Sequence, residues 1–194
     1  MTTRFYSFLI ALIACSVVAS NAFANDWFRR VAEMVNDERQ KVGLKRLVYN
    51  EKLEQAALSH SQWMARVGKM EHLQGERPQD FGDYLKSDHH HCTRILKTGY
   101  LDWQDLFDVT EDFNGRHVHA KANADDHVSE IIAYAGPGNG TVPDQLPIVV
   151  PGWMRSPGHR QVIVKTCWRD IGGAFAKARD GSTYYCVTFG QPVE

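Results

Sequence analysis

The stretch from residue 149 to residue 190 decides the fold, and it begins 149-VVPGWMRSPGHR-160. Proline disfavours helical geometry in the residue before it, and glycine tolerates a positive φ. Ser156-Pro157-Gly158 is therefore predicted to end a helical turn that carries Trp153, a side chain expected to anchor the core. His159 follows directly and is expected at the junction between two elements, where it can face a cleft.

Two β-type runs come next, over residues 170–178 and 182–189, and they flank Arg179-Asp180-Gly181. Asp-Gly is a hairpin signal because both residues tolerate the positive φ of tight turns. The pattern predicts an antiparallel hairpin. A turn centred between Asp180 and Gly181 places Cys186 roughly opposite Phe175.

Two amphipathic helices are predicted in the first half of the chain, because apolar residues recur there at helical spacing. The first covers residues 27–42 and ends at Gly43. The second covers residues 51–67, with Asn50 as its cap and Gly68 as its end. The predicted buried faces are Phe28, Val31, Met34, Val35 and Val42 in the first helix, and Leu53, Ala56, Ala57, His60, Met64 and Val67 in the second.

A less regular helix is predicted before Trp153. Asp144 is a suitable cap, but Pro147 and Pro151 lack the amide hydrogen that a continuous helix uses, so we expect interruptions there. Residues 47–50 are expected to form a short connector.

These segments together resemble the CAP superfamily, which includes cysteine-rich secretory proteins, antigen 5, plant pathogenesis-related proteins and many bacterial SCP-like extracellular proteins. The likeness rests on Trp-Met-x-Ser-Pro-Gly-His-Arg, Asp-Ile-Gly-Gly-Ala and Tyr-Tyr-Cys-Val-Thr-Phe-Gly in the second half, and on Val-Asn-Asp-Glu-Arg at 35–39 in the first. It covers residues 27–72 and 128–190. The resemblance implies an α+β fold, a three-layer α-β-α sandwich around a central antiparallel sheet.

Residues 73–127 are longer than the loop that bacterial relatives usually have at this point, so an insertion is predicted within them. The segment contains several aromatic residues. Disordered segments are poor in aromatic side chains, so the insertion is expected to pack against the domain.

The composition and the N-terminus indicate an exported single domain. The chain has 194 residues, with 22 Lys and Arg against 23 Asp and Glu, and this balance excludes a basic nucleic-acid surface. Residues 1–24 are predicted to be a signal peptide, because they contain a positively charged Arg4, an apolar run over residues 8–18 and an Ala-Phe-Ala cleavage site that ends at residue 24. We expect a secreted or periplasmic monomer, residues 25–194, without a transmembrane segment. Cys15 lies in a lipoprotein-like box, which offers an alternative anchored form.

Three cysteines remain after removal of the signal peptide: Cys92, Cys167 and Cys186. Export permits a disulfide, and three thiols leave at least one unpaired. The sequence leaves the pairing open.

His72, Glu130 and His159 form the candidate site. In the family, two histidines and two acidic residues line a central cleft, and the resemblance places three of them at these positions; Ser156 stands where the second acid usually falls. Two imidazoles and a carboxylate suit Zn²⁺ or another divalent cation, with a water in an open position. The same groups could hold a catalytic water without metal. A buried polar cluster that ties the layers together is the structural alternative.

Three functions therefore stay open, with binding favoured over catalysis. The first is a secreted protein whose His/Glu cleft binds a divalent cation or small ligand. The second is an extracellular, peptidase-like hydrolase that uses His72, Glu130 and His159 on a water. The third is a lipid or sterol carrier, with Val149, Val150 and the aromatic residues of the insertion in an apolar groove.

Weaker candidates surround this site. His89, His90, His91 and Cys92, with His117 and His119, could form a second metal site, since imidazole and thiolate are good zinc ligands. Adjacent histidines diverge, so at most two of the three can share one ion. The alternative is a solvated loop with Cys92 in a disulfide. Ser61 is expected to be structural, and Arg160 to contact Glu130 or face solvent.

Overall fold

The computed structural model describes residues 27–112, 115–120 and 126–192. The predicted signal peptide lies outside these residues. A first helix covers residues 27–41. The other helices are α2 (Glu51–Val67), α3 (Phe81–Lys86), α4 (His91–Lys97), α5 (Trp103–Leu106), α6 (Val142–Arg155) and α7 (Pro157–Ile163). Within this part of the chain, no helix is both long and apolar enough to cross a membrane.

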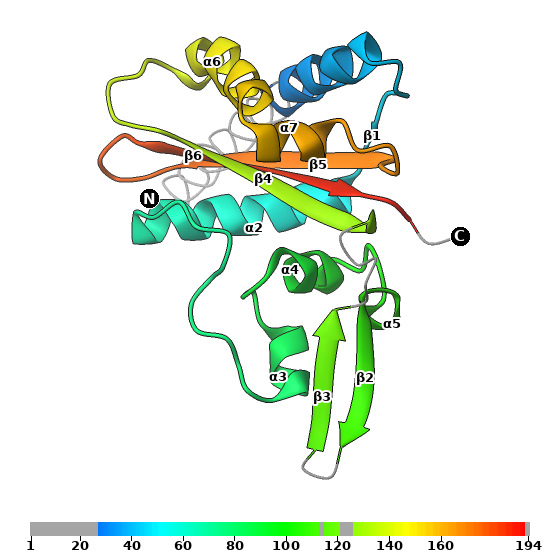
Figure 1. Cartoon of the computed structure of the whole chain (residues 1–194). Helices are drawn as coiled ribbons and strands as arrows, with labels where there is room; N and C mark the ends of the chain where they lie inside the picture. Colours follow the sequence, from blue (N-terminus) through cyan, green and yellow to red (C-terminus); the bar gives the residue numbers. More distant parts are fainter. Residues whose placement is uncertain (1–26, 113–114, 121–125, 193–194) are drawn as a thin grey trace, which may run out of the picture.

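A four-stranded sheet forms the middle layer of the domain. Its order is β1 (Val48–Tyr49), β5 (Asp170–Lys177), β6 (Thr183–Gly190) and β4 (Val128–Ala135). The three long strands pair antiparallel, and the short β1, in the segment expected to be a connector, pairs parallel with β5. The 27–41 helix, α6 and α7 lie on one face and α2 on the other (Figure 1), which confirms the α-β-α sandwich.

The β5–β6 hairpin forms where the sequence predicts it. Gly181 takes a φ of 86° in the turn. The last strand pair is Lys177–Thr183, so the turn is centred on Asp180 rather than between Asp180 and Gly181. As a result the expected pairing of Cys186 with Phe175 is wrong by one residue, and Cys186 lies opposite Ala174.

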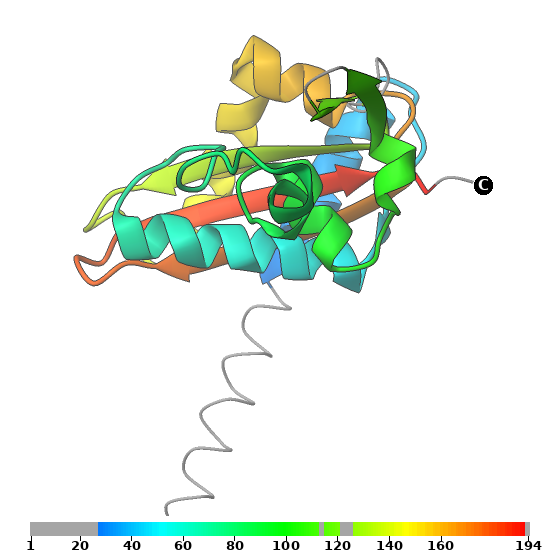
Figure 2. The same ribbon diagram turned by 90° about the horizontal axis from the view of Figure 1, so that it is seen from below.

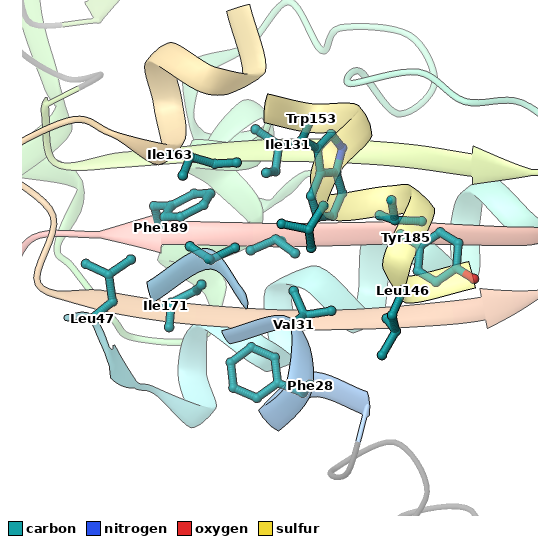
Figure 3. Packing of buried hydrophobic residues seen from close by; sticks show 14 of the residues in the cluster. Phe28, Val31, Leu47, Ile131, Leu146, Trp153, Ile163, Ile171, Tyr185 and Phe189 are labelled. Carbon is teal, nitrogen blue, oxygen red and sulfur yellow. The ribbon is translucent and has the colours of Figure 1, made fainter. Parts of the chain in front are cut away.

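The larger core fills the space between the sheet and the 27–41 helix, α6 and α7 (Figure 3). Phe28, Val31 and Val35 are buried there, as their spacing predicts. Val42 lies beyond the last helical turn and is 47% exposed, so it is not part of the buried face. Trp153 is a core anchor: it is buried, and its indole Nε1 donates to the Ile132 carbonyl at 2.9 Å.

α2 lies unusually close to the opposite face of the sheet. A Cβ added to Gly172 of β5 would meet the backbone nitrogen of Glu54 at 2.2 Å. Thr188 of β6 fixes the same contact, because its hydroxyl donates to the Leu53 carbonyl at 2.9 Å. The cap and end of α2 are as predicted: Asn50 accepts the amides of residues 52 and 53, and Gly68 takes a left-handed conformation.

The region from α6 to α7 differs from its prediction. Thr141 is the N-cap of α6, and Asp144 is its capping-box partner instead of the cap. Pro147 and Pro151 lie inside an unbroken helix. They follow Pro143 at four-residue intervals, so each missing amide would have faced the carbonyl of the preceding proline. Pro147 is exposed and Pro151 is half-buried, on the side of the helix away from the core, where carbonyls can bend toward water.

Pro157 and Gly158 begin a helix instead of only ending one. Proline is favourable at the first helical position, where its missing amide hydrogen has no intrahelical acceptor. α7 therefore starts at Pro157, directly after Ser156 caps α6. His159, expected at the junction of two elements, lies in the first turn of α7.

Residues 73–127 contribute α3, α4, α5 and a separate hairpin of β2 (Phe107–Asp112) and β3 (Gly115–Ala120). α2 and α4 pack against each other below the sheet in Figure 1, and in Figure 2, which is seen from below, both lie in front of it. A second core joins them through Leu53, Cys92, Ile95 and Leu106. α4 thereby reaches the start of β4, where the candidate site lies.

Candidate functional site

Glu130 is the centre of a buried polar cluster between β4, α2 and α4. Its side chain is 1% exposed. The carboxylate accepts hydrogen bonds from Nη2 of Arg94 at both oxygens, at 2.8 and 2.7 Å. His72 Nδ1 lies 2.9 Å from Oε1, and His60 Nε2 lies 3.5 Å from the same oxygen but is not aligned for a hydrogen bond. The Cys186 thiol donates to Oε2 at 3.6 Å.

Arg94 is a buried cation that the sequence did not single out. It belongs to α4, and its side chain is 1% exposed. Besides Glu130, it donates to the carbonyls of Asp88, His89 and His72 at 2.9, 3.3 and 3.2 Å. These contacts fix the guanidinium on the segment that leads into α4, so Arg94 holds that segment against β4.

Glu130 is ionised in this environment. Burial alone raises the pKa of a carboxyl group, but the Arg94 guanidinium, the His72 hydrogen bond and His60 outweigh it, and the pKa of Glu130 lies far below its usual range. The pair of Glu130 and Arg94 is therefore a buried, hydrogen-bonded ion pair.

His72 connects this buried pair to solvent. Its side chain is 52% exposed. Because Glu130 is ionised and can only accept, Nδ1 of His72 donates this hydrogen bond, and Nε2 is the ring nitrogen left for another partner. A carboxylate that orients an imidazole in this way is common beside metal ions and catalytic bases.

His159 stands apart from the other two predicted residues. Its Nδ1 lies 2.8 Å from the Ser156 hydroxyl. Burial lowers the pKa of His159, and the nearby His72 lowers it further, so the two rings are within electrostatic reach. Among the hydrogen bonds of the described residues, none joins His159 to His72 or Glu130. The structure therefore brings His72 and Glu130 into contact and leaves His159 beside them.

Two cavities open along β4. The first, here named the apolar cavity, has a volume of about 630 Å³ and is lined by Ile132, Ile148, Val149 and Trp153, among others, with Arg155, Ser156 and His159 as polar members. The second, here named the histidine cavity, measures about 710 Å³ and includes His72, His90, His91, Glu130 and Lys165 in its lining. The predicted site residues are thus divided between two neighbouring hollows.

A divalent cation does not fit all three predicted donors at once. Both oxygens of Glu130 accept from Arg94, so a cation bound to Glu130 would lie beside a buried guanidinium and be repelled by it. His72 and His159 remain as possible metal ligands, each through Nε2, because Nδ1 contacts Glu130 in His72 and Ser156 in His159. Cation binding by two imidazoles without a carboxylate is weak compared with the predicted set.

Among the described residues, neither Ser61 nor Arg160 forms a hydrogen bond with Glu130. Ser61 is buried, and its hydroxyl donates to the Leu58 carbonyl at 3.0 Å. Arg160 is exposed, and Arg94 takes the place expected for it at Glu130. None of the three described cysteines, Cys92, Cys167 and Cys186, forms a disulfide. The side chains of His117 and His119 lie outside the described part of the structure.

Comparison with known proteins identifies the family. The model of the CAP, or cysteine-rich secretory protein, family matches residues 32–189. Because the match covers most of the chain, this protein belongs to the CAP family, whose members are typically extracellular. No curated protein matches the sequence.

Two solved structures have similar folds. An outer surface protein of Borrelia burgdorferi is 20% identical with a TM-score of 0.56, over 85% of this chain and 92% of that one. An extracellular protein of Bacillus anthracis that contains an SCP domain is 15% identical with a TM-score of 0.57, over 87% of this chain and 41% of its own. At such identities the likeness concerns the fold alone.

Proposed function

We propose that this protein is an extracellular binding protein that takes a small amphipathic ligand in the apolar cavity. Small-molecule sites are usually concave and mostly apolar, with a few polar groups that orient the ligand. The apolar cavity has this character: Ile132, Val149 and Trp153 line its body, and Arg155 and His159 are among its polar members. This lining carries the proposal.

The polar members suggest which chemical group the ligand presents. Arg155 carries a fixed positive charge, and guanidinium groups bind carboxylates and phosphates in a bidentate manner. His159 adds a hydrogen bond near it. A ligand with an apolar body and an anionic head group therefore matches the lining, and binding needs no chemical step.

The test is binding of a fluorescent fatty-acid probe to the purified mature chain. Gly152→Leu should reduce its affinity about tenfold or more, a change of about 1.4 kcal/mol. Gly152 lines the cavity, and an added Cβ meets no atom within 4 Å, so the new side chain projects into open space. Gly158→Leu is the matched control: it is equally uncrowded and lies outside the cavity lining.

The head group is tested with a charge-matched pair of variants. Arg155→Gln should weaken binding of the anionic probe more than that of its uncharged methyl ester, whereas Arg160→Gln, exposed on the adjacent helix, should leave both unchanged. Equal affinity of wild type, Gly152→Leu and Gly158→Leu for the probe would remove the support for this proposal.

A divalent cation at His72 and His159 is the second candidate. The oriented ring of His72 favours it, because Glu130 holds Nδ1 and leaves Nε2 toward the exposed side. Comparing the Zn²⁺ affinity of His72→Ala and His159→Ala with that of wild type tests cation binding at these two residues. Hydrolysis of a peptide library by the same proteins tests the hydrolase alternative.

A further inference from the structure

Three potential metal ligands meet at the start of α4. His90 is the N-cap of this helix, and His91 and Cys92 are its first two residues. One potential ligand atom from each of the three lies within 4.8 Å of the others. The two imidazole rings are 4.0 Å apart between centroids, although adjacent histidines usually diverge. His89 is not part of this group, since its Nδ1 lies 3.0 Å from the Gln74 carbonyl.

The ring of His91 supplies an independent sign of a ligand. Its Nε2 is buried and has no hydrogen-bond partner among the described residues. A buried polar atom without a partner costs about 1–3 kcal/mol, so such atoms are rare without a bound ion or water. His91 and His90 also line the histidine cavity, so both residues lie beside a hollow that opens to solvent.

The His90 ring is already in a suitable protonation state. Its Nδ1 accepts the backbone amide of Cys92 at 3.3 Å, so this nitrogen carries a lone pair. The bond is long for a hydrogen bond and is weak for that reason. A metal ion can take over this lone pair at little cost to the helix cap.

We propose that His90, His91 and Cys92 bind one Zn²⁺ ion. On binding, the Cys92 thiol releases its proton to solvent, and the thiolate and the two neutral imidazoles each donate an electron pair to the ion, with no change of oxidation state. Zinc bonds of about 2.0–2.3 Å place tetrahedral ligand atoms about 3.5 Å apart, so the three atoms need to close by about 1 Å. Because His90 and His91 line the histidine cavity, a water from this cavity can supply the fourth ligand.

This site is independent of the proposed ligand site. None of its three residues lines the apolar cavity, and none is among His72, Glu130 and His159. The buried pair of Arg94 and Glu130 beside it is neutral as a unit, so the thiolate supplies the negative charge that the ion requires.

Co²⁺ replaces Zn²⁺ as a spectroscopic probe in the first experiment. The reduced mature chain is titrated with Co²⁺, and the near-ultraviolet charge-transfer band of a cobalt–thiolate bond is expected to saturate at one equivalent and to disappear when Zn²⁺ is added. Wild-type protein without this band overturns the proposal, whether or not any variant folds.

Zinc titration calorimetry of variants separates this site from the cleft. His91→Ala and Cys92→Ser should each weaken Zn²⁺ binding at least about tenfold, and His72→Ala and His159→Ala should leave it within about threefold. The opposite pattern assigns the ion to the cleft and overturns the proposal.

Alkylation of native protein, read by mass spectrometry, gives a control within one molecule. One equivalent of Zn²⁺ should slow modification of Cys92 several-fold and leave the partly exposed Cys167 unchanged. Equal effects on both thiols, or on neither, also count against the site.

Discussion

Replacing Arg94 with methionine should destabilise the folded protein by about 3–5 kcal/mol at pH 7, because it leaves the buried Glu130 carboxylate without its cation. Methionine retains most of the volume, so the loss reports the charge and its hydrogen bonds rather than a cavity. Both oxygens of Glu130 lose a donor, and so do the carbonyls of Asp88, His89 and His72. A loss of this size is a large part of the 5–15 kcal/mol that stabilises a typical domain.

Urea unfolding followed by tryptophan fluorescence measures the effect, and Lys97→Met provides a matched control. Lys97 lies on the same helix and pairs with Asp88 at 2.7 Å, but the two side chains are 44% and 42% exposed. Exposed pairs contribute about 0–1 kcal/mol, so Lys97→Met should fall in that range. If Arg94→Met costs no more than Lys97→Met, the account of a buried, ionised Glu130 is refuted.

Two further measurements test whether Glu130 is the cause. Arg94→Met/Glu130→Gln should be more stable than Arg94→Met, since the amide buries no charge. In wild type the pKa of Glu130 is lowered on folding, so its contribution is complete above the unfolded pKa near 4.5 and is lost as pH falls below it. In Arg94→Met, burial should instead raise the pKa of Glu130, so acid relieves the penalty and the two stability curves converge as pH falls.

Other predictions concern the contact between α2 and the sheet, and the buried His60. Gly172→Ala should cost about 1–3 kcal/mol, because the added methyl group overlaps the α2 backbone. Gly158→Ala should be neutral or stabilise the protein by about 0.5–1 kcal/mol. Thermal unfolding compares the two variants, and equal melting temperatures contradict the close approach of α2 to the sheet. Asn50→Ala should cost about 1 kcal/mol by loss of the α2 cap, read by urea unfolding. Burial lowers the pKa of His60 to about 4, so the free energy of unfolding should decrease as the pH is lowered from 6.5 to 4. His60→Gln should show a flatter dependence on pH. The same slope in both proteins excludes His60 as the source.

Local patterns in the sequence predict many of the helices and strands of the sandwich. Helical spacing and end signals are properties of neighbouring residues, so the C-terminal end of the 27–41 helix and both ends of α2 fall within one residue of their expected positions. The β5–β6 hairpin follows from its Asp-Gly turn in the same way, apart from a register shift of one residue. The register was wrong because the Asp-Gly signal predicts that the chain reverses there, but it does not predict which two residues form the last pair of the hairpin.

The prolines of α6 show where local rules fail. A proline normally breaks a helix, and that rule takes no account of the four-residue spacing that places Pro147 and Pro151 on one stripe away from the core. Tertiary packing of Leu146, Val150 and Trp153 holds the helix together despite the missing hydrogen bonds. The same limit applies to Pro157, which begins a helix where the pattern predicted only an end.

Arg94 could not be identified from the sequence for a different reason. α4 has seven residues, too few for hydrophobic periodicity to mark an inward face, and nothing local distinguishes Arg94 from Lys97 three residues later. One is buried against Glu130 and the other pairs at the surface. The difference depends on where α4 docks, which is set by contacts with α2 and β4 far away in the chain.

The surroundings of Glu130 therefore depend on α4, which lies outside the two segments, 27–72 and 128–190, that carry the sequence resemblance, although the family model spans it. His72, Glu130 and His159 come from the segments that carry the resemblance. α4 places the Arg94 guanidinium on the Glu130 carboxylate, and His90 and His91 line the same cavity. The Arg94 guanidinium neutralises the Glu130 carboxylate, as a bound metal ion would, but unlike an ion it cannot dissociate from the protein. Zinc affinity in this protein should therefore depend on His91 and Cys92 of α4 rather than on His72 and His159.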